Sequence, residues 1–303
     1  IALFPQDGRD IRTITRQADA ALYHAKEAGR GRYRYFTDRT GASAEERMRT
    51  EHDLRIALSN GDFLLAWQPQ FHLPERRIGG VEALVRWNSD VHGPVSPGKF
   101  IPLAEDTRLI VPIGKWVMQQ ACCEAAQWPG HIGVNVNVSP EQLTEPDFAT
   151  SVVHALSHSG LAAERLEIEV TESIFLRDAN VARRALEQVM ALGCSVALDD
   201  FGTGYSSLGY LRKLRFSTIK VDQTFVQGAS QASAESLAII NAVVAMARSL
   251  GMTTTAEGVE TAEEAEMIRS MGCNKIQGYH FGRPMLAAEA RQVFEREEAR
   301  RLA

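Results

Sequence analysis

Two adjacent carboxylates, Asp199 and Asp200, stand at the end of a short apolar run, residues 196–198. The run is typical of a buried strand, and the glycine-containing segment 201–204 that follows indicates a turn. Unpaired buried charge is strongly disfavoured, so two anions at the tip of a buried strand favour a cation beside them. The pattern predicts a metal site at the carboxyl end of a parallel strand; a helix cap or a solvated turn is the alternative.

Polar side chains also stand at the end of nearly every other short apolar run. In chain order they are Gln68, Glu82 and Arg86, Asn135 and Asn137, Glu167, Glu169 and Glu172, Asp199 and Asp200, Lys220 and Asp222, Glu257 and Glu260, and Gln277. Converging carboxylates repel one another and take up protons without a counter-charge. Oxygen ligands suit hard divalent ions such as Mg²⁺ or Mn²⁺, and the lack of histidine at these positions argues against zinc.

The adjacent carboxylates of Asp199 and Asp200 can serve two ions at once. Two ions roughly 3.5–4 Å apart are the usual arrangement for activating water against a phosphodiester. Lys220 would then supply a fixed positive charge, or a proton donor, near the attacking water or the scissile phosphate. A Mg²⁺-dependent lyase of the enolase type is an alternative chemistry, which the paired aspartates and Arg86 disfavour.

Several of these side chains also have a purely structural interpretation. Glu167 and Asp222 can be surface or salt-bridged groups, and Asn135 can alternate outward from Asn137. Arg86 suits either phosphate recognition or a structural ion pair.

Eight short apolar segments alternate with helix-like segments, which indicates a parallel sheet. The predicted strands are Leu64–Gln68, Gly80–Arg86, Ile132–Asn137, Leu166–Val170, Ser195–Asp199, Thr218–Val221, Thr253–Ala256 and Lys275–Gln277. The predicted helices include one from an Asp178 cap to Gly193, one over about 234–251, and one that the capping box of Thr261 and Glu264 opens.

Eight strands of this kind predict an α/β fold, a closed (β/α)8 TIM-like barrel with its site at the carboxyl ends of the strands. An open doubly wound sheet is the alternative, but no glycine-rich fingerprint follows the first predicted strand.

Residues 1–60 are predicted to lie outside the barrel. Two predicted strands, Ile1–Phe4 and Tyr33–Phe36, flank a helix with apolar periodicity between Ile11 and Ala25, and these elements cannot bury a core of their own. Residues 37–43 predict a linker, and Ala44–Leu58 a charged helix. We therefore expect a helical and strand remnant of a preceding domain at 1–40, a linker helix at 41–60 and the barrel at 61–303.

The 303 residues are 45% hydrophobic and 23% charged, which is ordinary globular composition. The net charge of −5 offers no electrostatic basis for binding a nucleic-acid polymer or an anionic membrane. The four cysteines form no C-x-x-C pair, which predicts reduced thiols. No apolar run is long enough to cross a bilayer, and no signal peptide is visible. We expect a cytoplasmic protein, or the cytoplasmic portion of a larger membrane-anchored or sensor-fused one.

From about Arg49 to Arg301 the chain resembles the EAL-domain cyclic di-GMP phosphodiesterases. The motifs that carry the resemblance are Glu82-Ala83-Leu84-Val85-Arg86-Trp87, Asn135-Val136-Asn137-Val138-Ser139, Glu169-Val170-Thr171-Glu172-Ser173, Asp199-Asp200-Phe201-Gly202-Thr203-Gly204, Ile219-Lys220-Val221-Asp222, Ala256-Glu257-Gly258-Val259-Glu260 and Gln277-Gly278-Tyr279. Residues 18–26 and Gly29-Arg30 resemble the C-terminal end of a GGDEF (diguanylate cyclase) domain, whose signature itself is absent.

The resemblance implies hydrolysis of cyclic di-GMP to linear 5′-pGpG in bacterial signalling and biofilm control, with two Mg²⁺ or Mn²⁺ ions as cofactors and Ca²⁺ as an inhibitor. The implied metal ligands are Glu82, Asn137, Glu169, Asp199, Asp200 and Glu257. The implied catalytic residues are Lys220, Glu257 and Glu82. The implied substrate contacts are Gln68, Glu82, Leu84, Arg86, Asp222, Glu260 and Gln277.

A loop after the paired aspartates is further implied to couple metal binding to homodimerisation. Its residues and their support are Glu172, Phe201, Gly202, Thr203 and Gly204. A receptor that binds cyclic di-GMP without turnover is the alternative function, and it usually lacks an acidic ligand or has a damaged loop. Neither defect is visible in this chain.

Overall fold

The computed structural model describes residues 1–302 apart from 28–32, 34, 37, 176–178 and 203–213. The chain divides into two compact units, one of residues 1–62 and 89–109 and one of residues 63–88 and 110–303. Among the described residues, no helix has the length and apolar character needed to cross a membrane. The boundaries 1–40, 41–60 and 61–303 remain predictions.

The first unit is mainly helical. Its elements are α1 (Ile11–Glu27), α2 (Asp38–Asn60), β3 (Gly93–Val95) and α3 (Pro97–Asp106). The predicted helix within 11–25 is confirmed, but the described residues of the two predicted strands, 1–4 and 33, 35 and 36, are not in strands. α2 begins at Asp38, so it includes most of the predicted linker. The described residues of the two segments meet at a backbone hydrogen bond from Phe36 N–H to Ile1 O at 2.8 Å, but they do not extend it into a strand ladder.

The second unit is a closed barrel of eight strands. These are β1 (Phe63–His72), β2 (Arg77–Ser89, whose last residue falls in the first unit), β4 (Gly133–Asn137), β5 (Leu166–Thr171), β6 (Ser195–Phe201), β7 (Thr218–Val221), β8 (Thr253–Ala256) and β9 (Lys275–Gln277). They lie in the order β1-β9-β8-β7-β6-β5-β4-β2, and the pairing of β1 with β2 closes the ring. All eight predicted strands, and the barrel, are confirmed.

One strand departs from the predicted parallel pattern. β1 runs antiparallel to both β2 and β9, whereas the pairs from β2 through β9 are parallel. β1 and β2 are joined directly by residues 73–76, and a connection this short permits only an antiparallel pair. Gln68 therefore lies within β1 rather than at its carboxyl end.

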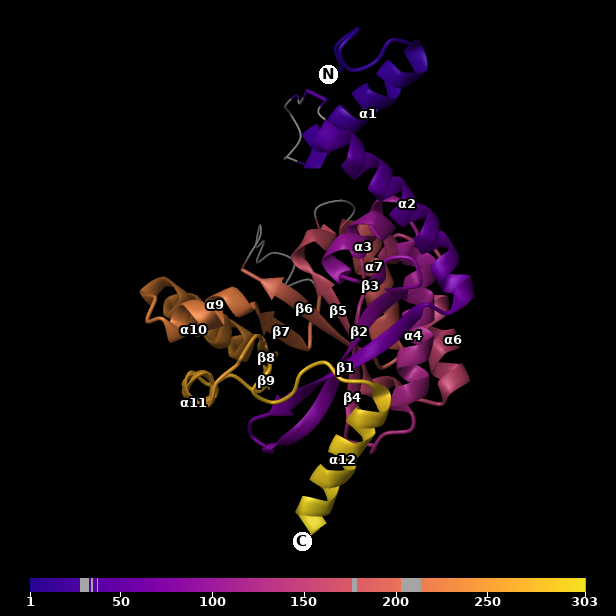
Figure 1. Cartoon of the computed structure of the whole chain (residues 1–303). Helices are drawn as coiled ribbons and strands as arrows, with labels where there is room; N and C mark the ends of the chain where they lie inside the picture. The colour runs from indigo at the N-terminus through magenta and orange to yellow at the C-terminus, as the bar shows by residue number, and fades with distance from the viewer. Residues whose placement is uncertain (28–32, 34, 37, 176–178, 203–213, 303) are drawn as a thin grey trace. The chain divides into compact units, whose positions relative to one another are not determined.

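Helices cover the outside of the barrel. They are α4 (Ile110–Ala125), α5 (Pro140–Leu143), α6 (Phe148–Ser159), α7 (Ala179–Ala191), α9 (Gln223–Ser230), α10 (Ala234–Ser249), α11 (Ala262–Ser270) and α12 (Ala287–Leu302), with short 3-10 turns η1 (Ala163–Arg165) and η2 (Glu172–Phe175). Figure 1 shows α9 and α10 side by side. The predicted capping box of Thr261 and Glu264 opens α11 as expected. Asp178, the predicted cap before α7, lies outside the described residues.

Apolar and polar side chains occupy opposite faces of the strands. Val134, Val136 and Ile168 are almost completely buried. The residues between them, Asn135 and Glu167, pair in register and are joined by a hydrogen bond. Since alternate residues of a strand share a face, the apolar set packs under the helices and the polar set fills the barrel. A barrel interior is usually packed with Val, Ile and Leu, so the polar filling marks this interior as the place to look for chemistry.

Candidate active site

A buried lysine stands at the centre of four carboxylates. Lys220 Nζ lies 2.7 Å from Glu169 Oε2 and 2.7 Å from Glu257 Oε1. It lies 3.2 Å from Asp199 Oδ2 and 3.7 Å from Glu82 Oε2. The Lys220 side chain is only 1% exposed. Four anions around one cation leave an excess of negative charge when all are ionised.

Parallel strands bring these groups together from distant parts of the chain. Glu82, Glu169, Asp199 and Lys220 lie on β2, β5, β6 and β7, and Glu257 directly follows β8. Burial lowers the pKa of Lys220, but the surrounding carboxylates, Asp199 and Glu169 foremost, outweigh this and raise its pKa well above the usual value. In the metal-free site Lys220 is therefore protonated at neutral pH.

Amide side chains fix the orientation of Glu82. Gln277 and Asn137 each donate a hydrogen bond to one of its two carboxylate oxygens. Gln277 also donates to Gln68 Oε1 at 3.1 Å. Burial raises the pKa of Glu82, but Lys220 and the two amide donors together lower it below the usual value. Glu82 is thus held ionised, in one orientation.

Three other carboxylates of the site, those of Glu169, Asp200 and Glu257, have raised pKa values because nearby positive charge does not fully compensate for their burial. Burial, followed by the repulsion of neighbouring carboxylates, raises the pKa of Asp200. Burial likewise raises the pKa of Glu169 well above its usual value and that of Glu257 to about 8, against the opposing effect of Lys220. These groups would gain most from a further cation.

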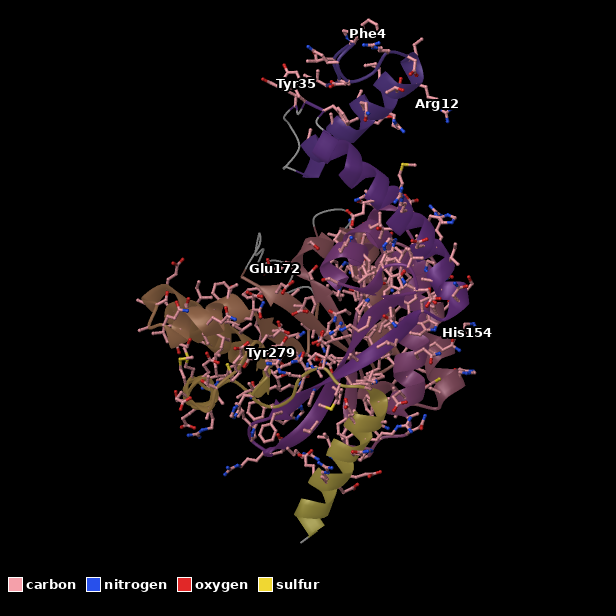
Figure 2. The ribbon with its side chains drawn as sticks, in the orientation of Figure 1. Phe4, Arg12, Tyr35, His154, Glu172 and Tyr279 are labelled. Carbon is pink, nitrogen blue, oxygen red and sulfur yellow. The ribbon has the colours of Figure 1, made fainter. Side chains whose placement is uncertain are left out.

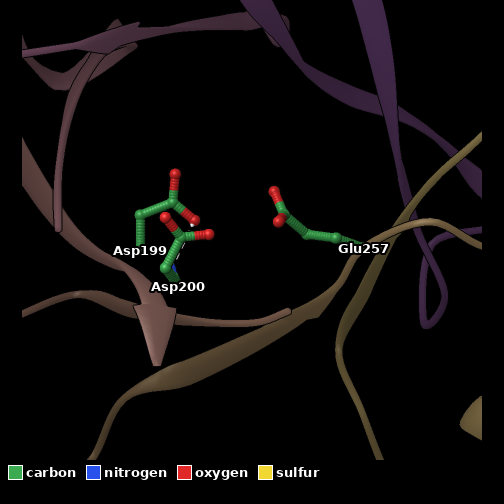
Figure 3. Close-up of side chains that lie close together, drawn as sticks. All are labelled: Asp199, Asp200 and Glu257. Atoms are coloured by element: carbon green, nitrogen blue, oxygen red, sulfur yellow. Dashed lines mark hydrogen bonds between the residues drawn. The ribbon is translucent and has the colours of Figure 1, made fainter. Parts of the chain in front are cut away.

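Within the described residues, one group of carboxylates has the spacing of a metal site. Oxygens of Asp199, Asp200 and Glu257 all lie within 4.8 Å of one another, and Figure 3 shows the two aspartates facing Glu257. Asp199 Oδ1 accepts a hydrogen bond from the backbone N–H of Asp200 at 2.9 Å. Asp200 has φ of 54°, a left-handed conformation that is uncommon for a residue with a side chain. Oxygen-only ligands of high charge fit Mg²⁺ or Mn²⁺.

The residues predicted to contact substrate fall into two groups. Gln68 and Gln277 join the Glu82 network directly, and Leu84 and Arg86 follow Glu82 along β2. Arg86 is half-buried, and burial lowers the pKa of its guanidinium.

An aromatic residue lies near this group. Tyr279 is close enough to Arg86 to act on its charge. It is labelled in Figure 2, and the guanidinium of Arg283 lies 4.2 Å from its ring centre.

Asp222 and Glu260 have other surroundings. Asp222 Oδ1 accepts a hydrogen bond from the backbone N–H of Thr224 at 2.9 Å, so Asp222 caps α9. Its charge nonetheless contributes to the raised pKa of Asp200. Glu260 is exposed, and its backbone N–H donates to Glu264. A substrate contact by either residue remains a prediction.

Glu172 connects with the turn after the paired aspartates. Its Oε1 accepts a hydrogen bond from the backbone N–H of Gly202 at 3.0 Å, which links η2 to the end of β6; Figure 2 labels Glu172. Phe201 is buried, and Gly202 has φ of 97°. Thr203 and Gly204 lie outside the described residues.

Two residues that sequence reasoning allowed a structural role belong to the barrel interior. Asn135 does not alternate outward from Asn137, because residues two apart in a strand face the same side. Its amide nitrogen donates to Glu169 Oε1 at 2.8 Å and to Glu167 Oε1 at 2.9 Å. Glu167 is therefore not a surface group, but the salt-bridged alternative is confirmed, since Lys275 Nζ lies 3.9 Å from its Oε1. The period-2 pattern of Asn135, Asn137, Glu167 and Glu169 was the signal that could have revealed this.

The chain matches one protein family over most of its length. The EAL domain family model matches residues 51–284. The bifunctional diguanylate cyclase/cyclic di-GMP phosphodiesterase MucR of Pseudomonas aeruginosa is 43% identical over 293 residues, which cover 95% of this chain and 43% of MucR. The cyclic di-GMP phosphodiesterase PdeR of Escherichia coli is 36% identical over 299 residues, covering 98% of this chain and 45% of PdeR. The chain thus spans less than half of these relatives.

Solved structures show the same fold. The PaMucR phosphodiesterase in complex with c-di-GMP superimposes with a TM-score of 0.76 at 41% identity, covering 80% of this chain and 99% of that one. The EAL domain of Mycobacterium smegmatis DcpA gives a TM-score of 0.67 at 32% identity, covering 78% of this chain and 98% of that one.

Proposed function

The chain belongs to the EAL-domain family, and on that premise we propose that it is a metal-dependent phosphodiesterase that hydrolyses cyclic di-GMP to linear 5′-pGpG. The observation that carries the proposal is the cluster of four carboxylates around buried Lys220, extended by Asp200 at its edge. The similarity to a phosphodiesterase whose solved structure holds c-di-GMP supports the choice of substrate. The same match leaves an enolase-type lyase without support.

The cluster has the ligands for two divalent ions. Glu82, Asn137, Glu169 and Asp199 would hold one Mg²⁺ or Mn²⁺ ion, and Asp199, Asp200 and Glu257 would hold the other. Bound ions of this kind act as Lewis acids on phosphoryl oxygens and lower the pKa of water.

The protein's own groups have complementary tasks. Lys220 keeps its proton, so it presents a fixed positive charge to the water or to the scissile phosphate. Burial raises the pKa of Glu257 to about 8, so in the metal-free protein this carboxylate becomes a proton acceptor as pH rises through about 8. Arg86 suits a phosphate of the dinucleotide because its planar guanidinium offers two parallel donors. Gln277 holds Glu82 in place and also donates to Gln68, and both glutamines would contact the dinucleotide.

The decisive experiment is an assay with separated products. Incubation with cyclic di-GMP and Mg²⁺ or Mn²⁺ over pH 7–9 should yield linear 5′-pGpG, and chelation should stop the reaction. Ca²⁺ should permit binding of the dinucleotide without turnover. Binding without any linear product in Mg²⁺ or Mn²⁺ would overturn the proposal and identify a receptor instead.

Metal affinity should depend on pH because metal and protons compete for the same carboxylates. Burial raises the pKa of Glu169, Asp200 and Glu257, the last to about 8, so the metal-free protein retains protons that an ion must displace. We expect the Kd for Mn²⁺, measured by calorimetry in buffers of different ionisation enthalpy, to weaken as pH falls below about 8. A Kd unchanged between pH 6 and pH 8.5, with no proton release, would contradict this.

The same carboxylates predict how stability depends on pH. Between the ordinary glutamate value of 4.5 and about 8, the folded metal-free protein holds protons that the unfolded chain has lost. Stability contributed by these groups is therefore lost as pH rises through this window. Lys220 does not add to this pH dependence, because it stays protonated in both the folded and the unfolded protein between pH 4.5 and about 8. Added Mn²⁺ should remove most of the decline in melting temperature.

We also propose that the protein is a homodimer formed through the segment after Asp199-Asp200. The bond from Gly202 to Glu172 supports this, since it ties the start of that segment to the edge of the site. A Cβ atom on Gly202 would lie 3.0 Å from the Phe225 ring, and φ of 97° strains any other residue.

Gly202→Ala should therefore weaken both dimerisation and turnover. Gly251→Ala is the matched control, because Gly251 also has positive φ but no atom of the described residues lies within 4 Å of the added Cβ. Backbone strain should cost both variants about 1–2 kcal/mol of folding stability, and Gly202→Ala should lose more because of its contact with Phe225. Sedimentation equilibrium and kcat should change only in Gly202→Ala; equal behaviour of the two variants would refute the coupling.

A further inference from the structure

Below the carboxylate cluster, the barrel interior holds a second polar layer. Asn135 lies in this layer on β4 and is only 4% exposed. Its register partners are Glu82 on β2 and Glu167 on β5. A buried amide at this position depends mainly on protein groups for its hydrogen bonds.

Asn135 uses its two amide hydrogens on two different carboxylates. Nδ2 donates to Glu169 Oε1 at 2.8 Å and to Glu167 Oε1 at 2.9 Å. A rotated amide would point its own oxygen at Glu167 Oε1 and Glu169 Oε1 and lose both hydrogen bonds, so the orientation with Nδ2 toward them is favoured. With Oε1 engaged, Glu169 presents Oε2 to the site, where Lys220 Nζ lies at 2.7 Å.

Glu167 is held from the other side. Its Oε2 accepts hydrogen bonds from the hydroxyls of Thr218 at 3.0 Å and Ser217 at 3.2 Å. Lys275 Nζ lies 3.9 Å from its Oε1. Glu167 is thus anchored independently of the cluster above it, and it can serve as a fixed reference for the Asn135 amide.

We propose that Asn135 is a positioning residue that makes Glu169 a one-oxygen ligand, and that Glu167 is the anchor that orients Asn135. Without the bond to Oε1, the Glu169 carboxylate is free to turn and offer both oxygens to Lys220 or to an ion. The inference rests on the proposed metal-dependent function, although it concerns only how the ligand is held. Groups that orient a ligand in this way typically contribute about 10–100-fold to metal affinity.

The test measures Mn²⁺ binding to the substrate-free protein, with electron paramagnetic resonance as the detection method. Asn135→Leu keeps the side-chain volume and removes both donors, and it should weaken the Kd for Mn²⁺ about 10–100-fold. At saturating Mn²⁺, kcat should recover substantially while the KM for cyclic di-GMP changes little. A purely structural role would lower the melting temperature without moving the Kd.

Thr255→Val is the matched control in the same interior. Thr255 is 1% exposed, and no described residue forms a hydrogen bond with its hydroxyl. Valine should therefore leave the Kd for Mn²⁺ where it was. An equal loss of affinity in Thr255→Val and Asn135→Leu would overturn the proposal, because the effect would then belong to the interior in general.

Glu167 provides a second pair of variants that does not depend on the folding of Asn135→Leu. Glu167→Ala removes the acceptor for the Asn135 amide and should weaken Mn²⁺ binding. Glu167→Gln keeps an oxygen that can accept the hydrogen bond from Asn135 Nδ2. Its amide nitrogen can donate to the hydroxyl oxygens of Ser217 and Thr218, so this variant should retain most of the Mn²⁺ affinity. Equal Kd values for both variants and the unmodified protein would refute the anchor.

These measurements separate the inference from the proposed function. If Asn135→Leu weakens Mn²⁺ binding but the unmodified protein does not hydrolyse cyclic di-GMP, the proposed function is refuted and the positioning role of Asn135 stands. Hydrolysis by the unmodified protein, with the Mn²⁺ affinity of Asn135→Leu unchanged, would do the reverse.

Discussion

Replacing Asp199 with asparagine should lower kcat for cyclic di-GMP by about 10³-fold, because a metal ion contributes several kcal/mol to the transition state and each ~1.4 kcal/mol is tenfold in rate. Asp199 is the carboxylate that both proposed ion sites share. Its Oδ2 lies 3.2 Å from Lys220 Nζ. A carboxylate oxygen of Asp199 also lies within 4.8 Å of oxygens of Asp200 and Glu257, which is close enough for the three residues to share a metal ion. Asparagine keeps the shape and one oxygen but removes the charge.

The same substitution should leave the metal-free protein at least as stable as before. The cluster holds more anions than Lys220 can neutralise, so loss of one charge relieves repulsion, most clearly above pH 8. The measurements are kcat, the Mn²⁺ stoichiometry and the melting temperature without metal. Asp147→Asn serves as control, since Asp147 is an exposed residue paired with Lys115 at 2.7 Å. Full turnover with two Mn²⁺ ions bound to the Asp199 variant would eliminate its shared role.

Replacing Lys220 with methionine should impair both turnover and folding. Methionine matches the length of the lysine stem but leaves Glu82, Glu169, Asp199 and Glu257 without their common cation. Removing one partner of a buried ion pair typically costs about 3–5 kcal/mol. We expect a loss of that order in the free energy of unfolding at pH 8 without metal.

Conditions that neutralise the carboxylates should rescue the fold of Lys220→Met but not its activity. Protonation near pH 5–6, or saturating Mn²⁺, supplies positive charge in place of the missing ammonium group, whereas neither replaces a fixed charge beside the phosphate. Lys115→Met is the control: an exposed pair such as Lys115 with Asp147 is worth only about 0–1 kcal/mol. Denaturant titrations at both pH values, with and without Mn²⁺, would decide; equal stability losses in the two lysine variants would contradict the central role of Lys220.

The elements of the barrel could be predicted from sequence because their signals are local. Apolar runs bounded by turn residues located all eight strands, and the Thr261–Glu264 capping box located the start of α11. The strand-end rule also selected Glu169, Asp199, Lys220 and Glu257, which the structure brings together with Glu82, a residue in the middle of β2. The strand-end rule works because parallel strands around a closed barrel deliver their carboxyl ends to one face.

Other features depend on which strand lies beside which, and a single sequence does not encode that locally. The antiparallel course of β1 places Gln68 opposite Glu82 in mid-strand. The terminal segments 1–4 and 33–36 read as strands, yet no ladder forms where they are described. Asp222 has the same charge as Asp199 but caps α9, since its backbone stands at a helix start.

The amino-acid sequence by itself determined that paired aspartates, further carboxylates and one lysine end a ring of strands, and that such a set calls for a cation. Only the tertiary structure decided that four carboxylates surround Lys220. It also decided that Asn135 and Glu167 belong to the same hydrogen-bond network. The physical reason is that residue type and strand period are local properties. Burial, charge balance and the single orientation of a buried amide arise only when side chains from distant strands share one interior.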